Sequence, residues 1–175
     1  FTKKVLPLKN SDVNKEEDMG LLLFDADGDG DNDLYCAAGG SEYSFRRGVY
    51  RHRIYANDGK GNFVEKLDAL PDVDVSGSCV VAGDIDSDGD LDLFVGGRNV
   101  PFQYPKPTTS RLLKNESVKG HIKFVDATQT LAKDLINVGL ICDGIWSDYD
   151  LDGWQDIILA GEFSDIKILK NNGII

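Results

Sequence analysis

The sequence is poor in the residues on which most catalytic sites depend. Its only histidines are His52 and His121, and neither lies in an H-E-x-x-H motif or beside a cysteine or serine motif. His52 lies within the strand-like segment RHR, where a packed or exposed side chain is expected, and His121 is expected to be solvated in a turn. We therefore assign no catalytic residue to this chain.

Long apolar runs are also missing. No run approaches the roughly 20 residues of a membrane helix, so the sequence predicts no membrane span. The first residues, FTKKVLPLK, have neither the hydrophobic region nor the cleavage site of a signal peptide. Because the sequence begins within a repeat, as described below, this absence says little about the parent protein.

The cysteines are few and odd in number, which excludes a fully paired disulfide framework. Cys36, Cys79 and Cys142 all lie in apolar, strand-like runs, so we expect buried free thiols. The cysteines leave the cellular compartment open.

Helical periodicity is almost absent. The best candidate, TQTLAKDLINVG at 128–139, is expected to hold one or two turns. The apolar runs are instead short, rich in β-branched, aliphatic or aromatic residues, and bounded by Gly, Asn or Asp, which is typical of strands. The sequence therefore predicts an all-β fold.

Basic residues are outnumbered by acidic ones, and the net charge of −11 argues against nucleic acid as a partner. Of the 30 acidic residues, 14 lie in three short segments: DADGDGDND (25–33), DIDSDGDLD (84–92) and DYDLDGWQD (148–156). Like charges this close destabilise a fold unless a cation lies among them. The segments therefore indicate bound cations.

The acidic segments also mark a repeat, since Asp84 follows Asp25 by 59 residues and Asp148 follows Asp84 by 64. An apolar run leads into each segment, a second run ending in Gly follows it, and a third run ends at an Asn turn. Two of the units close with a fourth short run. Four short antiparallel strands are the unit of a β-propeller blade. The predicted blades are 19–67, 77–128 and 140–175.

The two ends of the sequence are offset within this repeat. FTKKV at the N-terminus matches the fourth runs FVEKL (63–67) and FVDAT (124–128), so 1–9 is predicted to be the fourth strand of a preceding or closing blade. The third blade is predicted to lack its fourth strand. Closed propellers have four to eight blades. We therefore expect part of a larger propeller, or one completed by self-association through open blade edges.

Alternating aspartates with a glycine turn suit a hard cation that takes six to eight oxygen ligands, which favours Ca²⁺ over Mg²⁺. The first, third, fifth and ninth residues of each segment would provide side-chain oxygens, and the seventh its carbonyl oxygen. The sixth is always Gly, where a φ near or above zero is needed. The predicted metal ligands are Asp25, Asp27, Asp29, Asp31, Asp33, Asp84, Asp86, Asp88, Asp90, Asp92, Asp148, Asp150, Asp152, Trp154 and Asp156.

An EF-hand shares the first six positions of this pattern but requires Glu at the twelfth. Cys36, Val95 and Leu159 stand there instead, and the flanks are strand-like. The EF-hand is therefore excluded.

The pattern D-x-D-x-D-G-x-x-D between two strands, followed by an aliphatic run and Gly, resembles the FG-GAP (VCBS-type) repeat, and the resemblance covers nearly all 175 residues. This repeat builds calcium-binding blades in the integrin α-subunit propeller and in many bacterial surface proteins. The resemblance implies one structural Ca²⁺ per repeat, about three in all, each clamping the hairpin between the first two strands of a blade. Calcium sites of this kind favour an extracellular or cell-surface location.

The connections between the second and third strands, 39–52 and 96–111, are long and carry the aromatic and arginine side chains common in recognition surfaces. We expect them on the side opposite the acidic loops, where they either bind a protein or glycan ligand or pack against neighbouring blades. The candidates are Tyr43, Phe45, Arg46, Arg47, Tyr50, Arg51, Arg98, Phe102 and Tyr104.

The resemblance thus implies a calcium-binding module acting in adhesion or ligand binding. One alternative is part of a secreted, polysaccharide-directed enzyme, with catalysis on the long loops or in regions outside this sequence. Another is a scaffold for partner domains.

Overall fold

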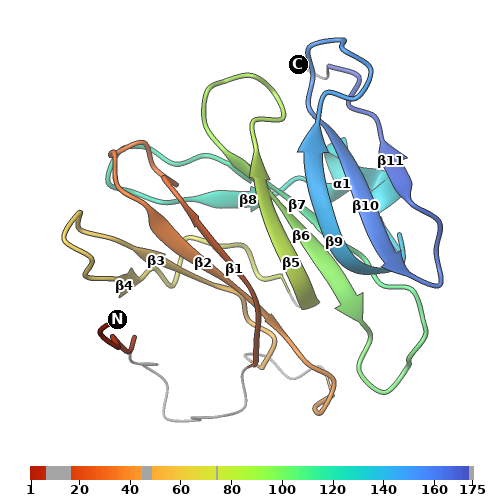
Figure 1. Ribbon diagram of the computed structural model, residues 1–175, viewed down its shortest axis with the longest axis horizontal. Helices are drawn as coiled ribbons and strands as arrows, with labels where there is room; N and C mark the ends of the chain where they lie inside the picture. Colours follow the sequence, from red (N-terminus) through yellow and green to blue (C-terminus); the bar gives the residue numbers. More distant parts are fainter. Residues whose placement is uncertain (7–16, 45–48, 74, 174–175) are drawn as a thin grey trace.

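The fold, seen in a computed structural model that describes residues 1–6, 17–44, 49–73 and 75–173, consists of three antiparallel sheets (Figure 1). Blade 1 contains β1 (Glu17–Phe24), β2 (Asp33–Gly39), β3 (Arg53–Ala56) and β4 (Val64–Glu65). Blade 2 contains β5 (Ser76–Gly83), β6 (Asp92–Asn99), β7 (Arg111–Asn115) and β8 (Phe124–Asp126). Blade 3 contains β9 (Leu140–Ser147), β10 (Asp156–Glu162) and β11 (Lys167–Leu169).

Each sheet follows chain order, so consecutive strands pair with one another. The all-β prediction is confirmed, and the sheets have the meander topology of β-propeller blades. The described residues form no closed ring. Residues 1–6, part of the predicted strand 1–9, form no strand, and 7–9 lie outside the described residues.

The first strands of the three blades lie next to one another, and their hairpin loops project from the same side of the molecule (Figure 1). This arrangement depends on small residues. A Cβ added at Gly20 would lie 2.6 Å from the carbonyl oxygen of Ser78, so only glycine lets β1 approach β5 this closely. Ser78 in turn donates a 2.7 Å hydrogen bond to the carbonyl of Ile141 in blade 3.

The core consists of two apolar layers, one at each interface between blades. Between blades 1 and 2, Phe24 and Phe124 have ring centroids 6.2 Å apart among buried aliphatic residues. Between blades 2 and 3, Phe94 packs with Ile141 and Leu159. Burial between blades, rather than within one sheet, therefore holds the fold together.

The connection between blades 2 and 3 holds the helical turns that were predicted there, α1 (Thr128–Leu131) and the 3₁₀ turn η1 (Lys133–Leu135). None of the described helices has the length and apolar character needed to cross a membrane.

The cysteines correct one expectation. Cys36 is buried and Cys79 is half-buried, but Cys142 is exposed, so the prediction of a buried thiol is wrong there. The cause is a bulge in β9: Ile141 pairs with Gly161 and Asp143 with Ala160, which leaves Cys142 without a partner in the ladder. His52, in contrast, is packed in the core as one of the two expected outcomes.

Candidate metal centres

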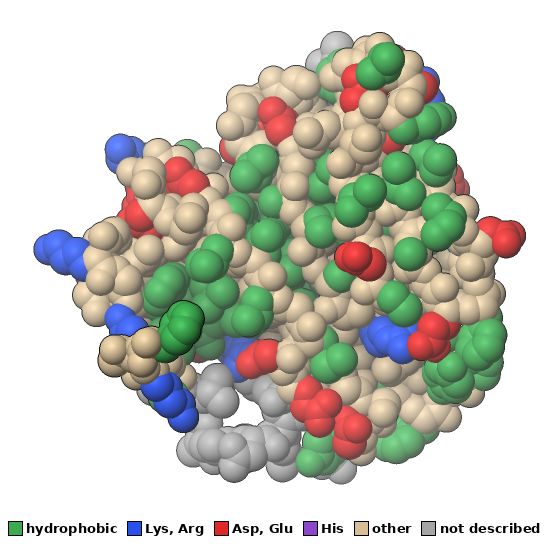
Figure 2. All heavy atoms as spheres, viewed as in Figure 1, with side chains coloured by type: hydrophobic (Ala, Val, Ile, Leu, Met, Phe, Trp, Pro, Cys, Tyr) green, Lys and Arg blue, Asp and Glu red, His purple; other side chains and the backbone are tan. Residues whose placement is uncertain are grey.

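The three acidic segments form the hairpin loops between the first and second strands of the blades: loop 1 (25–33), loop 2 (84–92) and loop 3 (148–156). Figure 2 shows acidic side chains at the tips of all three hairpins. The loops have one local architecture, which follows from their shared aspartates and glycines.

The first aspartate of each loop caps the turn. Asp25 accepts hydrogen bonds from the N–H groups of Gly28 at 2.9 Å and Gly30 at 3.0 Å. Asp148 accepts from the N–H groups of Asp152 and Gly153, both at 3.0 Å. These bonds wrap the backbone around the first carboxylate and turn the loop back on itself.

Two positions in each loop have positive φ. The sixth residue is the predicted glycine, with φ of 99° at Gly30, 95° at Gly89 and 94° at Gly153, so this expectation is confirmed. The fourth residue also has positive φ: 71° at Gly28, 60° at Ser87 and 60° at Leu151. Sequence reasoning missed this second position because serine and leucine give no signal of it.

The ninth aspartate is the buried anchor of each loop. Asp92 is fully buried, and its two oxygens accept from the N–H groups of Ile85 at 3.1 Å and Asn115 at 2.7 Å. Asp33 and Asp156 make the equivalent pairs of bonds. The ninth residue therefore joins the start of the loop to the end of the third strand.

The loops bring carboxylates together as a metal site requires. In each loop three carboxylate oxygens lie within 4.8 Å of one another. The remaining predicted ligands, Asp31, Asp33, Asp88, Asp90, Asp152 and Trp154, belong to the same loops but lie outside these groups. The groups are Asp25, Asp27 and Asp29; Asp84, Asp86 and Asp92; and Asp148, Asp150 and Asp156.

Several carboxylate oxygens of the predicted ligands, inside and outside these groups, are buried without a hydrogen-bond donor. They are Oδ1 of Asp27 and Asp31 in loop 1 and Oδ1 of Asp84, Asp86 and Asp90 in loop 2. A buried carboxylate oxygen without a donor is costly, whereas a hard cation needs oxygens of this kind. The residues present therefore fit calcium.

The charges within the loops oppose one another. Burial, together with Asp29 and Asp25, raises the pKa of Asp27. In loop 2, burial and then Asp88 raise the pKa of Asp90 to about 7, and burial raises the pKa of Asp92 to about 6. Cations placed among these carboxylates would relieve this repulsion.

Two lysines that sequence reasoning missed point into the acidic loops. Lys114 on β7 forms an ion pair with Asp86 in loop 2, and Lys170 after β11 forms one with Asp150 in loop 3. Each lysine directly precedes the asparagine at or just after the end of the third strand, Asn115 in blade 2 and Asn171 in blade 3. That position is the only sequence signal for them.

The first of the two predicted recognition loops is partly internal. Phe45, Arg46 and Arg47 lie outside the described residues. Tyr43 is exposed, whereas Tyr50 is buried and donates its hydroxyl to the carbonyl of Tyr43 at 2.6 Å, so Tyr50 cannot contact a partner in this conformation. The remaining candidate, Arg51, forms an ion pair with Glu65.

The second loop contributes to an exposed aromatic cluster. Phe102 and Tyr104 are 72% and 60% exposed, and the ring of Tyr104 lies 6.0 Å from that of Phe163, which is 81% exposed. Glu162 joins the second loop to the end of β10, since its carboxylate accepts a hydrogen bond from the Tyr104 hydroxyl at 2.9 Å and forms an ion pair with Arg98. Sequence reasoning missed Glu162 and Phe163 because they come from the end of β10 and the turn that follows it, away from the predicted loop.

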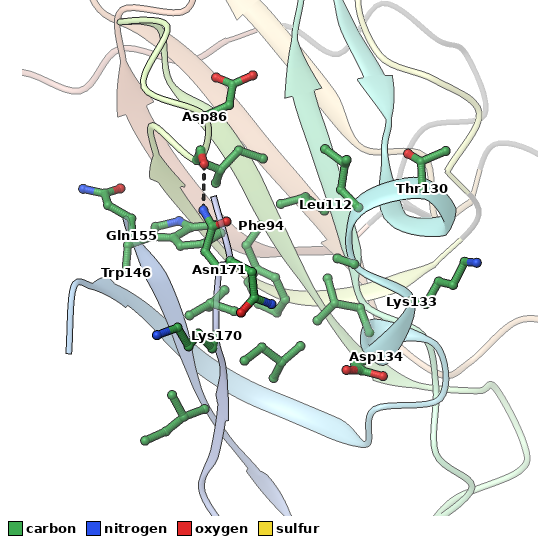
Figure 3. A pocket seen from close by; sticks show the side chains of 18 residues that line it. Asp86, Phe94, Leu112, Thr130, Lys133, Asp134, Trp146, Gln155, Lys170 and Asn171 are labelled. Atoms are coloured by element: carbon green, nitrogen blue, oxygen red, sulfur yellow. Dashed lines mark hydrogen bonds between the residues drawn. The ribbon is translucent and has the colours of Figure 1, made fainter. Parts of the chain in front are cut away.

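A cavity of about 550 Å³ lies between blades 2 and 3, beside β11 (Figure 3). Its floor is apolar, with Phe94 and Leu112 from blade 2. Its rim is polar, with Asp86, Lys170 and Asn171, and the Asn171 amide donates to the carbonyl of Ile85 at 2.7 Å.

The adjacent antiparallel sheets, each with its acidic hairpin loop on one common side, define a β-propeller-type module. Comparison with known families supports this class at the sequence level: residues 25–95 match the model of the FG-GAP-like repeat. The chain therefore contains an FG-GAP-like repeat, which runs from loop 1 into β6. No curated protein sequence matches the chain.

Proposed function

We propose that this chain is a calcium-binding β-propeller-type module in which each of the three loops holds one structural Ca²⁺. The observation that carries the proposal is the set of buried, donor-free carboxylate oxygens in loops 1 and 2. The predicted ligands are those given by the sequence, with the first, third, fifth and ninth side chains and the seventh carbonyl of each loop. When bound, Ca²⁺ supplies positive charge that joins carboxylates which otherwise repel.

The proposed role of the ions is structural because each loop connects the first two strands of a blade. The ninth aspartate already bonds to the backbone at both ends of this region, for example to Ile85 and Asn115 in blade 2. An ion that holds the third residue near the ninth would reinforce the same connection. Because Ca²⁺ would bind the folded chain and not the unfolded one, its binding stabilises the fold by mass action.

Calorimetric titration of the EDTA-stripped chain with Ca²⁺ tests this proposal, with a variant carrying Asp27→Asn, Asp86→Asn and Asp150→Asn as the control. We expect about one ion per loop for the native chain and a large loss of binding for the variant, since ligand charge sets affinity. Equal heats from both proteins would contradict the proposal.

The proposed setting is outside the cell or at its surface, and the proposed role there is adhesion or ligand binding. Loop sites of modest affinity fill only where calcium is abundant. The exposed cluster of Phe102, Tyr104 and Phe163 is the proposed contact surface, because exposed aromatic side chains are enriched at interfaces. Arg46 and Arg47 of the first loop are proposed to contribute charge.

Screening on a glycan array and a library of surface proteins tests the contact surface. The combined variant Phe102→Ala, Tyr104→Ala and Phe163→Ala should lose the ligand found by the native chain, while its melting temperature stays close to that of the native chain because the cluster is exposed. A loss of thermal stability instead would identify the cluster as a packing surface.

The open edge of blade 3 is the proposed site of self-association. Phe94 and Leu112 line the cavity and pair with each other across the second and third strands of blade 2. In blade 1 the residues paired at the same position are Tyr35 and Ile54, which face blade 2. There the core also contains Phe124, the fully buried first residue of the fourth strand β8, whose N–H bonds to the carbonyl of Ala69 at 2.8 Å. At the interface between blades 2 and 3, the cavity thus lies at the position that Phe124 fills at the interface between blades 1 and 2.

We assign this place to Phe1 of a second copy, with residues 1–6 as the added strand along β11. Phe1 and Val5 are exposed, and the N-terminus lies far from β11 within one chain (Figure 1). Sedimentation across a range of concentrations should show association that Phe1→Asp abolishes and Thr2→Ser preserves. A strictly monomeric mass at every concentration would exclude this contact.

A further inference from the structure

The two lysines that point into loops 2 and 3 have no counterpart at loop 1. Each lysine immediately precedes the asparagine whose N–H bonds to the ninth aspartate of its loop. In blade 1 this asparagine is Asn57, whose N–H bonds to Asp33 at 2.9 Å, so the equivalent position is Ala56. No described cation forms an ion pair with a carboxylate of loop 1.

The lysine contacts are the same in both loops. Each ammonium group reaches the carboxylates at the third and fifth positions, which are predicted ligands. Lys114 Nζ pairs with Asp86 and lies 3.9 Å from Asp88 Oδ2, and Lys170 Nζ pairs with Asp150 and lies 2.9 Å from Asp152 Oδ2.

The loops therefore differ in charge. With every aspartate counted as ionised, loop 1 has five aspartates and a formal charge of −5; loop 2 has five aspartates and Lys114, giving −4; loop 3 has four aspartates and Lys170, giving −3. Buried oxygens without a donor separate loop 3 from the other two loops, since they occur in loops 1 and 2 but not among the described side chains of loop 3.

We propose that the three loops bind Ca²⁺ with graded affinity, with loop 1 strongest and loop 3 weakest, and that Lys114 and Lys170 set this gradient as internal counter-cations. Calcium affinity in carboxylate loops rises with the charge of the ligands. A lysine ammonium beside the third carboxylate lowers that charge, and a Ca²⁺ ion must bind beside it or displace it. This inference rests on the proposed function, because it ranks the sites proposed there.

Installing the missing lysine is the most direct test. Ala56→Lys should lower the affinity of the tightest site by about tenfold, the order expected for one added charge at close range near a surface. Ala56→Met adds similar bulk without charge and should leave the affinity within about twofold of the native value. Calorimetry on the EDTA-stripped full chain measures both.

Removing a lysine should have the opposite effect. Lys170→Met and Lys114→Met should each tighten one weaker site by about tenfold, provided that the variant melts close to the native chain in EDTA. Trp154 lies in loop 3, whereas the second tryptophan, Trp146, packs against Gly83 beside loop 2. In a Trp146→Phe background, Tb³⁺ luminescence excited through Trp154 therefore assigns the change in Lys170→Met to loop 3.

The outcomes separate the gradient from calcium binding itself. Three ordered affinities that shift with Ala56→Lys and Lys170→Met support the gradient. Three sites that bind calcium but do not respond to the lysine variants overturn the gradient and leave the proposed function intact. No calcium binding by the native chain overturns both.

Discussion

The side-chain amide of Asn115 in blade 2 donates a hydrogen bond to the carbonyl of Ala26 in blade 1, 3.0 Å away. The next interface repeats this contact, since Asn171 in blade 3 donates to the carbonyl of Ile85 in blade 2 at 2.7 Å. Each bond joins the end of one third strand to the second residue of the neighbouring acidic loop. The metal loops and the interfaces between blades are therefore one connected structure.

Loss of this contact should loosen the interface. Asn115 is buried and its amide also donates to the carbonyl of Leu91 at 3.1 Å, so Asn115→Ala leaves two acceptors without a donor. We expect a cost of roughly 1–3 kcal/mol in the free energy of unfolding. Asn57→Ala is the matched control, because the Asn57 amide bonds only within its own blade and should cost less. Urea denaturation of both variants makes the comparison, and equal losses would argue against a special role for Asn115.

Two aspartates of loop 1 should respond differently to removal of their charge. Asp33 is buried with both oxygens bonded to backbone N–H groups, so Asp33→Asn should destabilise the fold by roughly 1–3 kcal/mol with or without calcium. Asp27 has a buried oxygen without a donor. Asp27→Asn removes a repelling charge, so it should be neutral or stabilising in EDTA and destabilising only relative to the calcium-loaded native chain. Melting curves in both conditions test this crossover.

The fourth position of loop 3 is strained. Leu151 has a φ of 60° and is 87% exposed, so its side chain gains little from packing while its Cβ crowds the backbone. Leu151→Gly relieves the strain at this φ but gives the unfolded chain more conformational freedom, and the two effects oppose each other. The net stabilisation of the fold should be up to about 1 kcal/mol. Leu151→Ala keeps the Cβ and should bring no such gain. If Leu151→Ala stabilised the fold as much as Leu151→Gly, the exposed leucine side chain, rather than backbone strain, would be the cause.

His52 should make stability depend on pH. Burial lowers the pKa of His52 to about 4, and its Nε2 lies 3.0 Å from the carbonyl oxygen of Val75. In the unfolded chain the imidazole takes up a proton near pH 6.5, whereas in the native chain it does so only near pH 4. The contribution of neutral His52 to the free energy of unfolding is therefore complete above about pH 6.5 and is lost as the pH falls to about 4. Between about pH 6.5 and pH 4 the free energy of unfolding of the native chain should fall by roughly 3 kcal/mol more than that of the His52→Gln variant. Parallel pH profiles would contradict the buried, neutral histidine.

The strands and loops were predictable because their signals are local. The acidic loop of blade 2, for example, has its glycine, its aspartates and both flanking apolar runs within a few residues of Asp84. The contacts that join distant segments were not predictable. Lys114 reaches Asp86 from the third strand, and Asn115 reaches across to Ala26 from another blade. Neither residue differs from an ordinary polar strand end in its own sequence context.

The recognition loops show the same limit. Tyr50 reads as a surface aromatic within an arginine-rich loop, yet its side chain is buried and its hydroxyl donates a hydrogen bond to the carbonyl of Tyr43 in the same loop. Phe163 lies in a separate turn, and only the fold brings it beside Tyr104. Exposure depends on which loops meet, and loop composition alone does not determine this.

The most direct test of calcium binding in the three loops is thermal unfolding of the chain in EDTA and in millimolar Ca²⁺, with bound metal counted by native mass spectrometry. Ions that bind only the folded chain must raise its stability, by about 2.7 kcal/mol for each site at a hundredfold excess over its Kd. We expect three bound calcium ions and a large rise in melting temperature. A chain that binds no metal and melts at the same temperature in both conditions would contradict this expectation.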